Sequence, residues 1–213
     1  MLFNSYEFIL FFLHIAVFMY FFFIKKRLII ASQAWLVLCS LFFYSWWNVS
    51  YLALILTSII VNYSIGTILS QEKPQPKVPR KTILTIGIIL NILCLGYFKY
   101  TDFFIANVNT LFATDFNMLN IVLPLAISFF TFQQIAYLVD SYKGYTKEYN
   151  FLTYTLFVSF FPQLIAGPIV HHKEMMPQFE SLKNKIFNHK NVSLGLFIFV
   201  IGLVKKVIIA DNF

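Results

Sequence analysis

Residues 51–69 read YLALILTSIIVNYSIGTIL, a stretch without a single charged side chain. A helix of about 20 residues, rising 1.5 Å per residue, crosses a hydrocarbon core of about 30 Å. Soluble helices rarely carry apolar side chains on every face over such a length. The stretch therefore predicts a transmembrane helix.

Six further apolar runs have comparable lengths: 8–24, 28–47, 82–98, 121–139, 152–170 and 193–209. The whole chain is 59% hydrophobic and 12% charged, with a mean hydropathy of +0.74. A soluble domain of ordinary composition carries about 25% charged residues. We predict one all-α domain, 1–213, that forms a polytopic transmembrane helical bundle in the cell membrane, with the lipid bilayer as its first partner.

The first run stays in the mature protein rather than acting as a cleaved signal peptide. Glu7 stands where a signal peptide has a basic region, and Lys25, Lys26 and Arg27 follow the run in place of a small-residue cleavage site. Because basic loops remain cytoplasmic, residues 25–27 predict an extracytoplasmic N-terminus. The basic loop 71–81 is cytoplasmic by the same rule.

Simple alternation fails at residues 171–192. They would lie outside, yet they carry Lys173, Lys183, Lys185 and Lys190 against Glu174 and Glu180. The sixth run supplies a reason, since residues 160–168, FFPQLIAGP, contain two prolines and a glycine. Such a segment loses backbone hydrogen bonds that lipid cannot replace. We therefore predict six crossings plus one broken or re-entrant element within 152–170, which returns 171–192 to the cytoplasm.

The net charge of +7 follows from these basic loops, so no nucleic-acid partner is expected. His171 and His172 are adjacent, but apart from Glu174 no carboxylate or cysteine stands at ligand spacing, and we expect no metal site.

Polar residues at membrane depth are the candidates for a functional site. Ser58, Asn62 and Gly66 share one helix face, as do Gly87, Asn91 and Cys94. Helix packing is the favoured interpretation of these stripes, and the lining of a substrate path is the alternative. The adjacent Gln133 and Gln134 cannot share one face, so one of them needs a partner or a cavity. The candidate lining residues are Asn62, Asn91, Ser128, Gln133, Gln134, Gln163, Gly167 and Pro168.

Several motifs together resemble the membrane-bound O-acyltransferase (MBOAT) family. They are 41–48 (LFFYSWWN), 95–100 (LGYFKY), 123–140 (LPLAISFFTFQQIAYLVD), 160–168 (FFPQLIAGP) and 204–211 (VKKVIIAD). The most similar branch contains the alginate O-acetylation protein and the peptidoglycan O-acetyltransferase. The motifs run in order across nearly the whole chain.

The resemblance implies an acyltransferase that takes an acetyl group from a cytoplasmic thioester donor, acetyl-CoA or similar, with no bound cofactor. The group would pass through a funnel in the membrane to an extracytoplasmic polysaccharide, usually with a partner acetyltransferase. Alginate, peptidoglycan and another surface polymer all remain open as acceptors.

Family members are about twice as long as this chain, and their catalytic histidine, next to a tryptophan, lies in the second half. No residue here takes that catalytic role, and His171 and His172 do not occupy its position. We therefore expect an N-terminal fragment of the MBOAT fold, inactive alone, from a truncation, a frameshift or a split gene. The alternatives are a non-catalytic subunit that pairs with a separately encoded C-terminal half, or a transporter component, which would also use broken helices.

Overall fold

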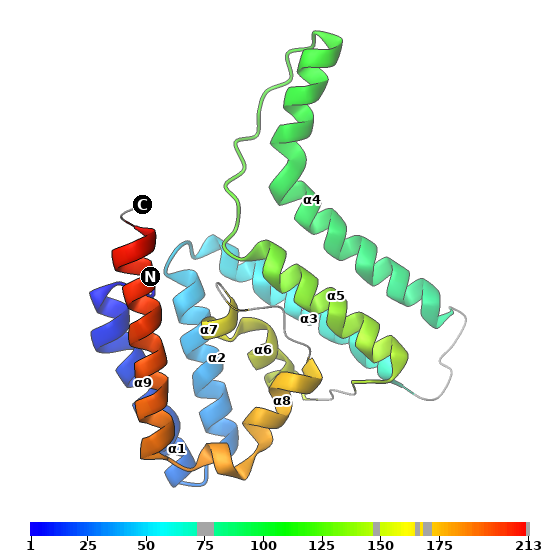
Figure 1. Cartoon of the computed structure of the whole chain (residues 1–213). Coiled ribbons are helices and arrows are strands. Elements are labelled where there is room, and N and C mark those ends of the chain that lie inside the picture. Colours follow the sequence, from blue (N-terminus) through cyan, green and yellow to red (C-terminus); the bar gives the residue numbers. More distant parts are fainter. Residues whose placement is uncertain (72–78, 147–149, 165–166, 168–171, 212–213) are drawn as a thin grey trace.

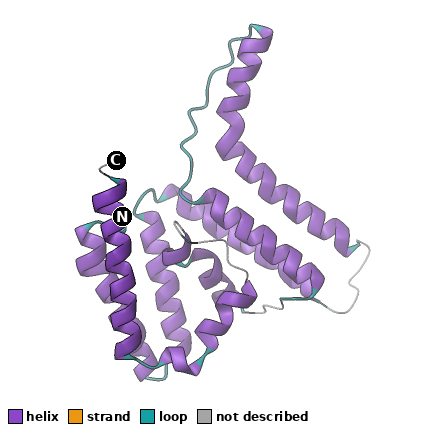
Figure 2. Ribbon diagram, viewed as in Figure 1, coloured by secondary structure: helices purple, strands orange, loops and turns teal. Residues whose placement is uncertain are grey.

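The computed structural model describes residues 1–71, 79–146, 150–164, 167 and 172–211. These residues form helices and connecting segments, with no strand among them (Figure 2). A π-helical turn, η1 (Glu7–Phe12), leads into α1 (Leu13–Lys25). The remaining helices are α2 (Ile29–Ser45), α3 (Ser50–Ser70), α4 (Arg80–Phe112), α5 (Ile127–Lys143), α6 (Phe151–Ser159), α7 (Phe161–Leu164), α8 (His172–Glu180), the 3₁₀ turn η2 (Leu182–Lys185), α9 (His189–Val204) and the π-helical turn η3 (Lys205–Ala210).

The described residues contain four helical segments long and apolar enough to cross a membrane. The predicted fold class, a polytopic helical membrane protein, is confirmed. Most large apolar side chains on the outer faces of these helices are exposed, as expected where lipid rather than water surrounds them. The four segments are Glu7–Lys25, Ser50–Ser70, Arg80–Phe112 and His189–Ala210, and Ile29–Ser45 is a shorter apolar helix.

Helices α1 to α5 run alternately up and down the bundle, because short turns join α1 to α2 and α2 to α3 (Figure 1). At one end, the Tyr51 hydroxyl of α3 donates to the carbonyl of Val122, 2.8 Å away, just before α5. At the other end, the Arg80 guanidinium donates to the carbonyls of Leu69 (2.6 Å) and Tyr142 (3.1 Å). Arg80 thus joins the end of α3, the start of α4 and the end of α5.

Helix α4 is much longer than the apolar run 82–98 that predicted it. Its 33 residues make it about 50 Å long, well beyond a bilayer core of about 30 Å. Residues 99–112 contain no proline or glycine to stop it, and it ends at Ala113, which has a left-handed φ of 49°. The Asp102 carboxylate accepts hydrogen bonds from the amides of Leu119 (2.8 Å) and Ile121 (3.0 Å) and so fixes the returning segment to the helix.

Helix α5 begins later than the apolar run 121–139. Residues 114–124 are not helical, and Ala126 has a left-handed φ of 58°, so the helix begins at Ile127. It continues to Lys143 and is terminated by Gly144, whose φ of 76° is the usual left-handed C-terminal cap. Asp140, in the last turn of α5, is buried within the protein at 7% exposure.

The sixth apolar run is divided into short pieces. Asn150 caps α6 by accepting hydrogen bonds from the amides of Leu152 (2.9 Å) and Thr153 (3.4 Å). The helix stops at Ser159, since Phe160 leaves the helical region with a ψ of 107°, and the four-residue α7 follows. Helix α6 packs on α2, α3 and α5 and also contacts α8, so the divided segment lies inside the bundle.

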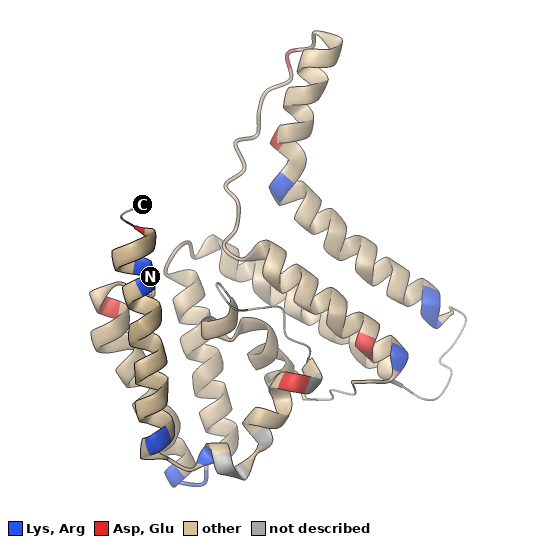
Figure 3. Ribbon diagram, in the orientation of Figure 1, with Lys and Arg blue, Asp and Glu red and all other residues tan. Residues whose placement is uncertain are grey.

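Both ends of the divided segment lie at the same end of the bundle. The end of α5 lies beside that of α3, because the Ser70 hydroxyl is 3.5 Å from the Thr146 carbonyl. The chain then returns beside the end of α1, where the ring of Phe187 meets that of Phe21 at 5.1 Å. Figure 1 shows α9 rising from that end, and Figure 3 shows basic residues in the α1–α2 turn and at the start of α9.

Candidate functional site

The break after α6 exposes backbone groups that neighbouring helices satisfy. In a continuous helix the Phe161 amide would donate to the Phe157 carbonyl. Here the Phe161 amide donates to Ser40 Oγ of α2 (3.2 Å), and the Phe157 carbonyl accepts from Gln133 Nε2 of α5 (2.9 Å). Ser40 in turn donates to the Leu36 carbonyl of its own helix (2.7 Å). Two side chains therefore stabilise a broken backbone at a depth where lipid offers no partner.

A chain of polar side chains connects α4, α3 and α5. Asn62 and Asn91 exchange reciprocal amide hydrogen bonds of 3.2 and 2.6 Å, and each also donates to a carbonyl of its own helix. The Ser58 hydroxyl then donates to Gln134 Oε1 (3.2 Å). Asn62 and Asn91 are buried, and their side-chain amides hydrogen-bond to each other. This is the arrangement expected of a contact between two helices.

Gln134 and Tyr154 keep hydrogen-bonding capacity in the interior. Both side chains are completely buried. Within the described part of the chain, Nε2 of Gln134 and the hydroxyl of Tyr154 have no hydrogen-bond partner. Burying such groups costs free energy unless something pairs with them. Both donors lie beside the break, and the hydroxyl of Tyr44, in the same core cluster, is a further buried group without a partner among the described residues.

An aromatic cluster surrounds this point. The rings of Tyr137 in α5 and Tyr154 in α6 are 4.5 Å apart, and the ring of His172 lies 5.0 Å from Phe157 and 5.8 Å from Tyr137. His172 is the first residue of α8 and is 7% exposed. The cluster joins α5, α6 and α8, so the helices on both sides of the break share one interior.

The eight predicted lining residues are not all together. Gln133 and Gln134 lie in the interior described above, whereas Asn62 and Asn91 form the contact between α3 and α4. Ser128 is half-buried in the first turn of α5, and Gln163 and Gly167 are half-buried in and after α7. Pro168 lies outside the described residues. Sequence reasoning missed Ser40 and Tyr154, because a hydroxyl within an apolar run carries no signal of its partner, and it considered His172 only as a metal ligand.

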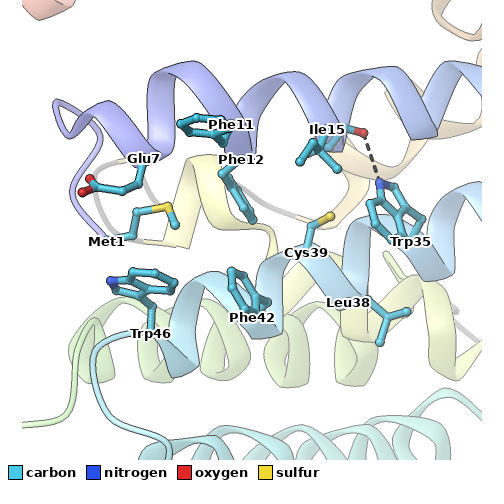
Figure 4. A pocket seen from close by; sticks show the side chains of 11 residues that line it. Met1, Glu7, Phe11, Phe12, Ile15, Trp35, Leu38, Cys39, Phe42 and Trp46 are labelled. Carbon is cyan, nitrogen blue, oxygen red and sulfur yellow. Dashed lines mark hydrogen bonds between the residues drawn. The ribbon is translucent and has the colours of Figure 1, made fainter.

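Two cavities lie on the other side of the bundle, and none of the eight residues lines them. One, of about 450 Å³, lies between α1 and α2 and has almost entirely apolar walls (Figure 4). Glu7 and Trp46 stand at one end of it, and beside its wall the Trp35 indole donates to the Ala16 carbonyl (3.2 Å). The larger cavity lies between α1 and α9. The described residues contain no group of three or more His, Cys, Asp or Glu that could hold a metal.

Apolar helices that pass from end to end, around a broken segment held by polar side chains, define a multi-pass membrane protein with a polar interior. Residues 145–213 match the model of the membrane-bound O-acyltransferase family, MBOAT. The resemblance predicted from the motifs is thereby confirmed, with the family model matching residues 145–213.

Curated relatives extend this similarity along the chain. A peptidoglycan O-acetyltransferase of Helicobacter pylori is 50% identical over an alignment that covers 84% of this chain and 38% of that protein. Probable alginate O-acetylases AlgI of Pseudomonas syringae pv. tomato and Pseudomonas aeruginosa are 35% and 33% identical, each over 83% of this chain and 34% of the relative. The chain thus spans little more than a third of these relatives' length. No solved structure matches the chain.

Proposed function

We propose that the protein takes part in O-acetylation of an extracytoplasmic polysaccharide, accepting the acetyl group from a cytoplasmic thioester donor. The support is the family match of residues 145–213 together with relatives that are named O-acetyltransferases or O-acetylases. The donor class, the partner acetyltransferase and the catalytic histidine outside residues 1–213 belong to this proposal.

Peptidoglycan is the acceptor that we favour. The relative named for peptidoglycan is 50% identical to this chain, whereas the relatives named for alginate are 33–35% identical. This difference in overall identity is the reason for ranking peptidoglycan before alginate.

The observation that carries the proposal is the segment from α6 to α8, which enters and leaves at one end of the bundle. A re-entrant segment brings backbone and polar side chains to mid-membrane without closing the bundle, as a passage for an acyl group requires. Gln134 Nε2 and the Tyr154 hydroxyl are the donors next to it. Donors of this kind bind a carbonyl oxygen of a thioester and stabilise the negative charge that develops during transfer.

The end at which this segment starts is proposed to face the cytoplasm, with the N-terminus outside the inner membrane. Lys25, Lys26 and Arg27 lie at that end, with Arg80 and Lys81 at the start of α4 and Lys190 at the start of α9. Basic residues next to spans remain cytoplasmic. The thioester donor would then approach the end at which the chain enters α6.

The test measures base-released acetate on purified peptidoglycan and on other envelope polysaccharides. Deletion of the gene should remove acetate from peptidoglycan, and the intact gene should restore it. Gln134→Leu in the intact gene should restore less acetate than Gln178→Leu, a change at an exposed glutamine of α8. Unchanged acetate on every polysaccharide after deletion would refute the proposal.

Expression of residues 1–213 alone separates the catalytic interpretation from the non-catalytic one. We expect membrane insertion without acetyl transfer, because no residue of the chain is assigned as the base. Turnover by this segment alone would place the base among these residues. The nucleotide sequence after the codon for Phe213 tests the fragment interpretation directly, since further spans and a Trp-His pair in another frame would support it.

A further inference from the structure

The larger cavity is a cleft between α1 and α9 with a volume of about 1130 Å³. This exceeds the roughly 300–1,000 Å³ typical of pockets for small ligands. Its walls are mostly apolar side chains of α1 and α9, among them Val17, Phe21 and Phe199, with His14 as a polar residue along α1. The cleft therefore suits a long apolar occupant at bilayer depth.

Helix α9 touches the bundle at few points. None of its residues is buried. Phe187, just before it, packs on Phe21 of α1 at 5.1 Å, and Phe199 packs against the cluster that contains Phe8 and Phe12. The contacts of Phe187 and of Phe199 thus hold α9 beside α1 at two separate heights along the bundle. The cleft lies between these two contacts.

Two lysines line one end of the cleft. Lys25 is the last residue of α1, and Lys185 is the last residue of η2. Both occupy the end of the bundle where the basic turn 25–27 lies, so they stand at headgroup depth. Basic pockets between membrane-spanning helices bind anionic lipid headgroups. The cleft has this combination, because lysines line one end of it and apolar helix faces line the rest.

We propose that this cleft binds an anionic glycerophospholipid of the cytoplasmic leaflet. The acyl chains lie along the aromatic walls formed by Phe21 and Phe199, and the phosphate pairs with Lys25 and Lys185. Anionic charge is favoured over a zwitterionic headgroup, because an ammonium or choline group would meet two cations. This site is separate from the interior beside α6, and its failure would leave the proposed acetyl transfer unaffected.

The test is native mass spectrometry of the full chain in nanodiscs, with phosphatidylglycerol and phosphatidylcholine as the probes. The double change Lys25→Gln and Lys185→Gln removes the cations that line the cleft. The matched control, Lys26→Gln with Lys190→Gln, removes the same charge from exposed positions that do not line it. At about 1 kcal/mol per lysine, the first pair should weaken phosphatidylglycerol retention roughly 10- to 30-fold, and the control should leave it nearly unchanged.

Glycine substitutions in α9 test the apolar part without altering charge. Gly195 lines the cleft and Gly202 does not, and a Cβ atom on either would meet nothing within 4 Å. Gly195→Leu should displace phosphatidylglycerol, whereas Gly202→Leu should retain it. Thermal unfolding in the same lipids checks that both variants are folded.

Three results would overturn the proposal. Equal loss of lipid in the two lysine pairs would reduce the effect to net charge. Equal retention of both probes in all variants would exclude a lipid site. A change from dimer to monomer with Gly195→Leu, at unchanged lipid binding, would assign the cleft to a second copy of the chain.

Discussion

The backbone of Gly66 in α3 lies against the ring of Tyr137 in α5, so closely that a Cβ atom on residue 66 would stand 2.2 Å from Cε1 of that ring. Tyr137 is 1% exposed and belongs to the aromatic cluster beside the break. The Tyr137 ring has little room to move, because it is buried and its centre is 4.5 Å from that of the Tyr154 ring. The missing side chain at Gly66 thus allows α3 to approach α5 this closely.

Gly66→Ala should therefore lower the free energy of unfolding by about 1–3 kcal/mol, the usual cost of overpacking. Gly96→Ala is the matched control, since a Cβ there would meet nothing within 4 Å. The control should be neutral or gain up to about 1 kcal/mol from higher helix propensity. Unfolding in mixed detergent and SDS micelles measures both, and equal effects would show that the close contact is not limiting.

Ser40→Ala tests the hydrogen bond that satisfies the broken backbone. It removes the acceptor of the Phe161 amide, and we expect a loss of about 1–2 kcal/mol, because a buried donor is left unpaired. Ser45→Ala is the control, since the Ser45 hydroxyl donates to a carbonyl of its own helix at an exposed position. The same micelle titration reports both variants. A loss no larger than that of the control would contradict the role assigned to Ser40.

A double-mutant cycle tests the pairing of Asn62 with Asn91. Changing each to Leu, alone and together, should give a coupling energy of about 0.6–1.7 kcal/mol, the range for polar pairs between membrane helices. Asn107 bonds only to the Phe103 carbonyl of its own helix among the hydrogen bonds that the structure describes. Combining Asn107→Leu with Asn62→Leu should therefore be additive, and coupling of similar size there would refute a specific pair.

Cysteine labelling tests the return of the chain to one end. In a background with Cys39→Ala and Cys94→Ala, an impermeant maleimide is applied to intact cells carrying Lys26→Cys, Asn48→Cys or Lys190→Cys. The α1–α2 turn and the start of α9 share one end, so Lys26→Cys and Lys190→Cys should both be protected, whereas Asn48→Cys should react. Reaction at position 190 as strong as at position 48 would mean that α6–α8 crosses the membrane.

Hydropathy predicted the helical class because lipid imposes the same apolar length on every span. The polar stripes that contain Asn62 and Asn91 were also predictable from the sequence, since helical periodicity places small and amide residues on one face of each helix. The end of α4 and the start of α5 could not be predicted from the sequence. Residues 99–112 are helical although Lys99 and Asp102 are charged, because a helix need not stop where the bilayer does.

The candidate site was predicted in part. Gln133 stood out as one of two adjacent amides in an apolar run, but its partner is the Phe157 carbonyl, 24 positions away. Ser40 lies 121 positions from Phe161, whose amide donates a hydrogen bond to it. Such pairs depend on how α2, α5 and α6 pack, which no local pattern contains. Whether the eight predicted residues line a passage stays a prediction.

The return of the α6–α8 segment to one end of the bundle affects whether the number of end-to-end passes is odd or even. In the described part of the chain, α1 to α5 and α9 pass from one end of the bundle to the other, an even number, and the returning segment adds none. Sequence changes that lengthen, shorten or shift this segment would leave every later helix with its orientation unchanged. On the proposed topology this segment adds no crossing, so its length and sequence can change without reversing the orientation of α9.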